Sequence, residues 1–121
     1  MGIVESGPRA RAASAEENAM IGVSVTFRYD GDFDRARVVS VAENARGAFE
    51  GMPGLRFKVF TIDDARQRAV NFYVWASPDA ARAFFSEEMR ERVTRLYGVE
   101  PTIEFVEIAQ LVDNGGASDP E

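Results

Sequence analysis

Apolar and polar residues alternate along four stretches of the chain, and a period of two is typical of β-strands. These stretches are residues 21–29, 55–62, 69–75 and 103–112. The third stretch carries Val and aromatic residues on both of its faces, which predicts an interior strand. In the first stretch the apolar positions are Ile21, Val23, Val25, Phe27 and Tyr29. The pattern therefore predicts four strands.

The first predicted helix follows the first strand. Asp30, Gly31 and Asp32 break the alternation, and Asp32 is available as a helix cap. From about Phe33 to Phe49, apolar residues recur at spacings of three and four, as on the buried face of a helix. The predicted inward positions are Val38, Val41, Ala42, Ala45 and Phe49. We expect Gly51, Pro53 and Gly54 to end this helix.

The second predicted helix runs from Pro78 to about Tyr97. Ser77 can accept a hydrogen bond from a free amide of the first turn, and Pro78 suits the first helical position. Asp79 complements the positive end of the helix, and Gly98 is a natural stop. The predicted inward positions are Ala81, Phe84, Phe85, Met89, Val93 and Leu96.

The predicted order is βαββαβ, with the second and third strands joined as a hairpin. Right-handed crossovers then place both helices on one face of a four-stranded antiparallel sheet, which is the ferredoxin-like α+β fold. The other face carries Val70, Phe72 and Val74, which are too apolar to face water as a continuous patch. A second copy of the sheet, related by a two-fold axis, is the simplest cover. We therefore expect a homodimer, a dimeric α+β barrel.

A single domain is predicted for residues 20–112, since a chain of 121 residues suffices for one core. Residues 1–19 are small, polar and rich in alanine, and we expect a disordered N-terminal tail. Residues 113–121 contain Gly, Ser and Asp, and they predict a flexible C-terminal tail.

Composition removes several classes of function. The net charge is −6 and no basic stripe is present, so nucleic-acid binding is not expected. The chain has no cysteine and no histidine. Thiol nucleophiles, imidazole bases and the usual ligands of zinc, iron or haem are therefore absent, and we expect no metal and no cofactor. No stretch is long and apolar enough to cross a membrane, so we expect a cytoplasmic protein.

The strand from Ala69 to Trp75 carries the strongest candidate site. Asn71, Tyr73 and Trp75 share one of its faces, where plain aliphatic residues would pack better. An amide buried without a partner costs about 1–3 kcal/mol. The structural alternative is that Asn71 bonds to the neighbouring backbone, while Tyr73 and Trp75 are core aromatics with satisfied polar tips.

Basic residues near this strand are further candidates. Arg56 and Lys58 share a face of the second strand, and Lys58 is the only lysine among 14 basic residues. Most such charges are solvated edge residues. A desolvated Arg56, Lys58 or Arg82 could stabilise an oxyanion, and a buried lysine could act as a base. Phe84 and Phe85 are predicted as core residues and as pocket wall.

Three segments resemble a known superfamily. They are residues 51–60 with a Pro-Gly-Leu entry to the second strand, residues 71–75, and residues 77–85 with the Ser-Pro-Asp helix start. They are similar to the dimeric α+β barrel proteins, and closest to the YdhR-like and antibiotic-biosynthesis monooxygenases. The resemblance covers about Met20 to Val112, and it implies a homodimer with a pocket between helices and sheet.

In the polyketide-tailoring members of this superfamily, an Asn and a Trp four residues apart face the pocket, and Asn71 and Trp75 match that pair. Those enzymes oxidise anthrone-like phenols with dioxygen and use no flavin, haem or metal. The haem-degrading branch needs an axial histidine, which this chain lacks. The resemblance therefore implies a cofactor-independent monooxygenase acting on a small aromatic or polycyclic, polyketide-like substrate.

Two alternatives stay open on the same scaffold. A non-oxidative cyclase or isomerase would use the same stabilisation of an enolate without oxygen. A non-catalytic dimeric protein would only bind a ligand, for example in a stress response.

Overall fold

Four antiparallel strands form one sheet in the spatial order β2-β3-β1-β4, in a computed structural model that describes residues 19–114. The strands are β1 (Ile21–Arg28), β2 (Leu55–Asp63), β3 (Arg68–Trp75) and β4 (Thr102–Glu107). β3 pairs along its whole length with β1 and with β2. The interior position predicted for β3 and its hairpin with β2 are thus confirmed.

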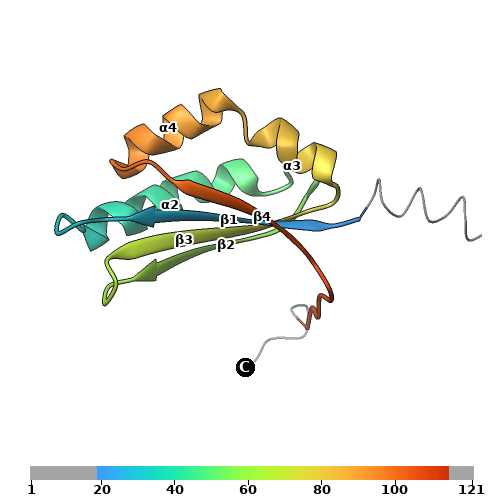
Figure 1. Cartoon of the computed structure of the whole chain (residues 1–121), viewed down its shortest axis with the longest axis horizontal. Coiled ribbons are helices and arrows are strands. Elements are labelled where there is room, and N and C mark those ends of the chain that lie inside the picture. Colours follow the sequence, from blue (N-terminus) through green and yellow to red (C-terminus); the bar gives the residue numbers. More distant parts are fainter. Residues whose placement is uncertain (1–18, 115–121) are drawn as a thin grey trace, which may run out of the picture.

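Three helices cover one face of this sheet, and the other face carries no helix among the described residues (Figure 1). They are α2 (Arg35–Phe49), α3 (Pro78–Phe84) and α4 (Glu87–Tyr97). This is the ferredoxin-like α+β arrangement that the alternating pattern predicted. None of the helices in the described residues is long and apolar enough to span a membrane. The predicted tails lie almost wholly outside residues 19–114, and the predicted domain boundaries stay a prediction.

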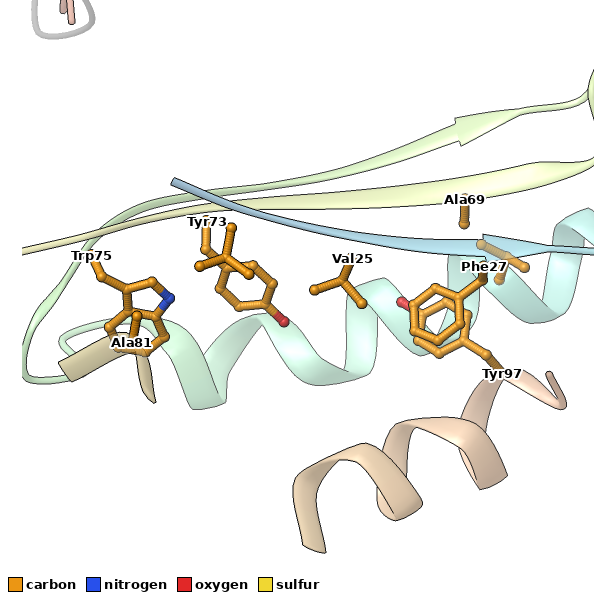
Figure 2. Close-up of a cluster of buried hydrophobic side chains, with 9 residues drawn as sticks. Val25, Phe27, Ala69, Tyr73, Trp75, Ala81 and Tyr97 are labelled. Carbon is orange, nitrogen blue, oxygen red and sulfur yellow. The ribbon is translucent and has the colours of Figure 1, made fainter. Parts of the chain in front are cut away.

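The core lies between the helices and the inner face of the sheet. Each strand sends alternate side chains toward the helices, and fully buried members include Val23, Val25, Phe27, Tyr73 and Trp75. Val38 of α2 and Ala81 of α3 close the core from the helix side. Figure 2 shows this cluster as a row beneath the sheet, from Trp75 at one end to the stacked rings of Phe27 and Tyr97 at the other. Those two rings are 3.7 Å apart and nearly parallel.

The prediction of one continuous helix from Pro78 to Tyr97 was wrong, because the helix breaks after Phe84. Ser86 begins a new helix: its hydroxyl accepts a hydrogen bond from the Met89 amide at 3.2 Å, and two glutamates follow in the first turn. Ser77 caps α3 in the same way, through the Ala80 amide. A second Ser cap inside the predicted helix therefore divided it. Leu96, predicted to point inward, is 44% exposed.

Two further boundaries differ from the prediction. α2 starts at Arg35, because the side chain of Asp34, and not that of Asp32, accepts the hydrogen bond from the Arg37 amide. β4 ends at Glu107 although the alternation continues to Val112. Its register with β1 explains this, since Glu107 pairs with Ile21, the first residue of β1.

A bulge changes the faces at the start of β2. Leu55 pairs with Trp75 and Phe57 pairs with Val74, so that Arg56 is an extra residue between two successive pairs. Leu55 therefore packs against the core, while Phe57 and Val59 lie on the outer face. The prediction that Arg56 shares a face with Lys58 was wrong for this reason, since strict alternation would also have placed Leu55 with Phe57.

The outer face of the sheet is apolar at its centre. Phe72 of β3 lies across β1, where Gly22 leaves room for its ring. A Cβ atom on Gly22 would lie 2.8 Å from Cζ of Phe72. Phe57 and Val106 of the flanking strands are 47% and 43% exposed.

Candidate functional site

A cavity of about 180 Å³ lies between α2, α4 and the inner faces of β2 and β3. Its walls are mostly apolar, as is usual for sites that bind small organic molecules. The polar residues that reach it are Lys58, Asn71, Tyr73, Arg92 and Tyr97. The apolar lining includes Val41, Ala45, Phe49, Met52, Phe60, Phe84, Met89 and Val93.

Lys58 enters this cavity from β2, an edge strand. Its Nζ donates a hydrogen bond to the Tyr73 hydroxyl at 2.9 Å, across the strand pair that Lys58 and Tyr73 form. Nζ also lies 3.4 Å from the centroid of the Phe49 ring. Burial lowers the pKa of Lys58 from 10.5 to about 7. Lys58 is therefore a group of the cavity that changes its charge near neutral pH.

Asn71 and Tyr97 form the second polar pair. The Asn71 side chain is 4% exposed, and its Nδ2 donates a hydrogen bond to the Tyr97 hydroxyl at 3.1 Å. The expected alternative of a bond from Asn71 to the neighbouring backbone is therefore not what satisfies this amide. Burial raises the pKa of Tyr97, and the hydrogen bond from Asn71 acts in the opposite direction.

This pair stands between two cavities. Asn71 and Tyr97 also line a smaller space of about 160 Å³, on the side of Val38 and Ile62. A ligand in either cavity can thus contact the Asn71 amide and the Tyr97 phenol.

Tyr73 connects the lysine to the aromatic core. Burial raises its pKa well above the ordinary value of 10, so its hydroxyl stays protonated at neutral pH. Its ring contacts Phe85 edge to face at a centroid distance of 4.9 Å and stacks on Trp75 at 6.0 Å. Tyr73 is therefore held rigidly by the rings around it.

Trp75 shares the face of Asn71 but does not line the cavity. Its side chain is 2% exposed, and the Phe84 ring covers it at a centroid distance of 5.1 Å. In Figure 2 the indole lies close to Ala81 of α3, between this helix and the sheet. The indole Nε1 is buried and has no hydrogen-bond partner within the described part of the chain. Of the two predicted wall residues, Phe84 lines the cavity and Phe85 packs behind Tyr73.

The structure does not bring Arg56 and Arg82 into this cavity. Arg56 is exposed and lines an open groove beside Arg46 and Glu50. Arg82 lies on the exposed side of α3, where its guanidinium is paired with Asp79 at 2.6 Å. Of the three predicted basic residues, only Lys58 reaches the cavity.

Two residues of the cavity were not predicted as site residues. Tyr97 was predicted only as the end of a helix, and Arg92 was given no role. Both line the cavity from α4. Arg92 and Tyr97 are five residues apart, and this spacing gives no signal of a shared site. Both lie on α4, which forms a separate helix because the predicted helix breaks before Ser86. Recognising the Ser86 cap was the step that could have revealed them.

No group of three or more acidic, histidine or cysteine residues that could hold a metal ion occurs in the part of the chain that the structure describes. The polar atoms that line the cavity are an amine, an amide, two phenols and a guanidinium. Such a set binds and polarises an organic oxygen atom, and it offers no carboxylate to a metal.

Comparison with solved structures gives the same fold. A Streptomyces coelicolor monooxygenase from the gene ActVA-Orf6, in complex with nanaomycin D, matches with a TM-score of 0.61 at 22% identity, over 81% of this chain and 95% of that one. SnoaB, a cofactor-independent oxygenase from Streptomyces nogalater, matches with a TM-score of 0.58 at 19% identity, over 77% and 96%. At these identities the likeness establishes the fold, and activity has to be argued from the site.

No protein-family model matches the chain. No curated protein matches its sequence either.

Proposed function

We propose that the chain is a cofactor-independent monooxygenase that oxidises a small aromatic or polycyclic phenol of the anthrone or polyketide type. The observation that carries the proposal is an apolar cavity lined by two polar pairs, Lys58–Tyr73 and Asn71–Tyr97. The fold shared with known monooxygenases supports it.

In this proposal the chain activates the substrate and not the oxygen. Lys58, with a pKa of about 7, takes a proton from the substrate and then compensates the charge of the resulting anion. Asn71 donates a hydrogen bond to the substrate oxygen, where charge develops. The carbanion reduces dioxygen, and a methylene carbon becomes a carbonyl with release of one water. No metal or organic cofactor takes part.

The aromatic residues have separate roles in this proposal. Tyr73 holds the Lys58 amine by its hydroxyl, Phe84 forms the wall beside the substrate ring, and Phe85 supports Tyr73 from behind. The Nε1 of Trp75, which has no partner among the described residues, can donate to a substrate oxygen that reaches it. Arg92, at the α4 side of the cavity, adds a second positive charge.

Oxygen uptake with a model anthrone tests this proposal. We expect consumption of one dioxygen for each anthrone converted to its quinone, with the same rate after dialysis against a chelator. Arg56→Gln is the control variant and should leave oxygen uptake unchanged. Arg56 is a cation on β2, the strand of Lys58, but it lies outside the cavity. Anthrone that binds without oxygen uptake above the buffer rate would refute the oxidation.

A non-oxidative cyclase or isomerase is the second candidate. A lysine with a pKa of about 7 supports it as well, because a general base is most effective near the working pH. Conversion of a substrate under anaerobic conditions would identify this function. Binding with no conversion in either atmosphere would identify a non-catalytic ligand-binding protein.

We also propose a homodimer formed through the outer faces of two sheets. The central residue of that face is Phe72, and Phe57 and Val106 expose apolar surface beside it. A charged Phe72→Glu variant should sediment as a monomer at micromolar concentration, while the original chain sediments as a dimer. Arg56→Glu, at an exposed position of the same sheet, is the control for added negative charge. A monomeric original chain would refute the dimer.

A further inference from the structure

Lys58 carries the only side-chain amine of the protein, and this amine lies among aromatic rings. Its Nζ is 3.4 Å from the ring centroid of Phe49, 4.1 Å from that of Phe60 and 4.2 Å from that of Tyr73. The amine thus stands at the wall of an apolar cavity, and it also borders the open groove on the outer side of Phe49. A small molecule can approach it from two sides.

No carboxylate from the described residues lines the cavity, so the Lys58 ammonium has no anionic partner there. The other cation in the lining is Arg92. In the adjoining groove, Glu50 forms an ion pair with Arg46 at 3.2 Å. The rings favour the ammonium form, and desolvation opposes it and lowers the pKa to about 7. About half of the amine is then neutral, and therefore nucleophilic, at neutral pH.

An acid stands next to this nucleophile. The Tyr73 hydroxyl is 2.9 Å from Nζ, and it remains protonated because burial raises its pKa. Tyr73 is fixed by its contacts with Trp75 and Phe85. A buried amine with a positioned proton donor is the pair of groups that imine formation requires.

We propose that Lys58 condenses with the carbonyl group of an apolar aldehyde or ketone bound in the cavity, and that it forms an imine there. This site goes beyond the proposed oxidation and does not depend on it. A cavity of about 180 Å³ with aromatic walls suits an aryl aldehyde or aryl ketone with one or two rings.

The step is balanced without an oxidant or a reductant. Nζ adds to the carbonyl carbon, and the C–N bond forms as the carbonyl oxygen takes a proton from the Tyr73 hydroxyl. The ammonium nitrogen of the carbinolamine returns a proton to Tyr73. The C–O bond then breaks, the oxygen leaves as water with a second proton from the same relay, and C=N forms. One amine and one carbonyl give one imine and one water.

Reductive trapping of the full chain tests the proposal. Incubation with benzaldehyde and cyanoborohydride converts an imine to a stable benzylamine, which intact mass and peptide mapping locate. We expect a single adduct on Lys58, formed at a rate that rises with pH and levels off above about 7. A rate that still rises toward pH 10, or an adduct on the N-terminal amine alone, would overturn the proposal.

A displaced lysine is the matched control. In the double variant Lys58→Met with Arg56→Lys, the amine moves two positions along the same strand to an exposed site outside the cavity. We expect labelling at position 56 to be at least about tenfold slower at pH 7. Tyr73→Phe keeps the ring and removes the acid, and should slow adduct formation at Lys58 about tenfold. Equal rates at positions 56 and 58, or an unchanged rate in Tyr73→Phe, would contradict the site.

Discussion

The two ends of the inner face of β3 differ although their residues point the same way. Asn71 lies at an open end: it lines two cavities and donates a hydrogen bond to Tyr97. Trp75 lies four residues further, at a closed end, where Phe84 covers it and its Nε1 has no partner in the described chain. The strand supplies both side chains to one face.

The covering helices decide which of these side chains can meet a ligand. α3 lies directly over the Trp75 end, and its Phe84 fills the space there. α4 starts again at Ser86, and the cavity opens between it and α2. An alternating pattern on a strand thus predicts which residues face the helices, and the breaks between helices predict where a cavity opens.

Loss of Asn71 should have the largest effect. Asn71→Ala removes the proposed donor to the substrate oxygen, and we expect turnover to fall about 10²–10³-fold while the proposed dimer persists. The free energy of unfolding should fall by about 1–3 kcal/mol, because the Tyr97 hydroxyl loses its partner. Oxygen uptake and chemical denaturation measure the two effects. A loss of stability with unchanged turnover would leave Asn71 with a structural role only.

Lys58→Met should change how stability depends on pH. The pKa of Lys58 is about 7 in the folded chain and about 10.5 when unfolded, so the unfolded chain binds more protons between these values. The stability of the original chain, measured relative to Lys58→Met, should therefore rise by about 2 kcal/mol between pH 7 and pH 9. Denaturation of both proteins across this range tests it. A constant difference would mean that Lys58 keeps an ordinary pKa, and that its role as a base fails.

Trp75→Phe should have a smaller effect on turnover than Asn71→Ala. The indole is covered, so we expect turnover to fall about tenfold or less, and stability to fall by about 1–2 kcal/mol from the cavity left behind. The same change in a Phe84→Ala background sharpens the comparison, because the ring that packs against the indole is then absent. A loss in Trp75→Phe as large as that in Asn71→Ala would show that the closed end opens during turnover.

Ser86→Ala should have the smallest effect. It removes the cap of α4 and should lower the free energy of unfolding by about 1 kcal/mol. Turnover should also fall, because α4 carries Arg92 and Tyr97. Ser77→Ala, which removes the corresponding cap of α3, should cost similar stability with less effect on turnover. Denaturation and oxygen uptake on both variants measure this. Equal losses of turnover would mean that the two helices position the site together.

The sequence was sufficient for the number of strands and for the faces of β3, because alternation is a local property. Asn71, Tyr73 and Trp75 were correctly predicted to share one face. The bulge at Arg56 was not predicted, since an extra residue in a strand leaves the composition unchanged and appears only in the pairing. It separates Leu55 from Phe57 and removes Arg56 from the face of Lys58.

The partner of Asn71 could not be predicted in the same way. Tyr97 is 26 residues further along the chain, and the packing of α4 against the sheet brings it to Asn71. The Ser86 cap that begins α4 was visible as Ser-Glu-Glu, but the apolar spacing on both sides of it agreed with one continuous helix. Local capping therefore outweighed the longer pattern.

The position of Trp75 has a spectroscopic consequence. It is the only tryptophan of the chain, so all indole fluorescence comes from one site in the core. An indole buried among phenylalanine rings emits at shorter wavelength than one in water. A ligand that displaces Phe84 would shift or quench this emission, whereas a ligand confined to the Asn71 end would leave it almost unchanged. The protein thus carries a natural optical reporter that distinguishes the two ends of its binding face.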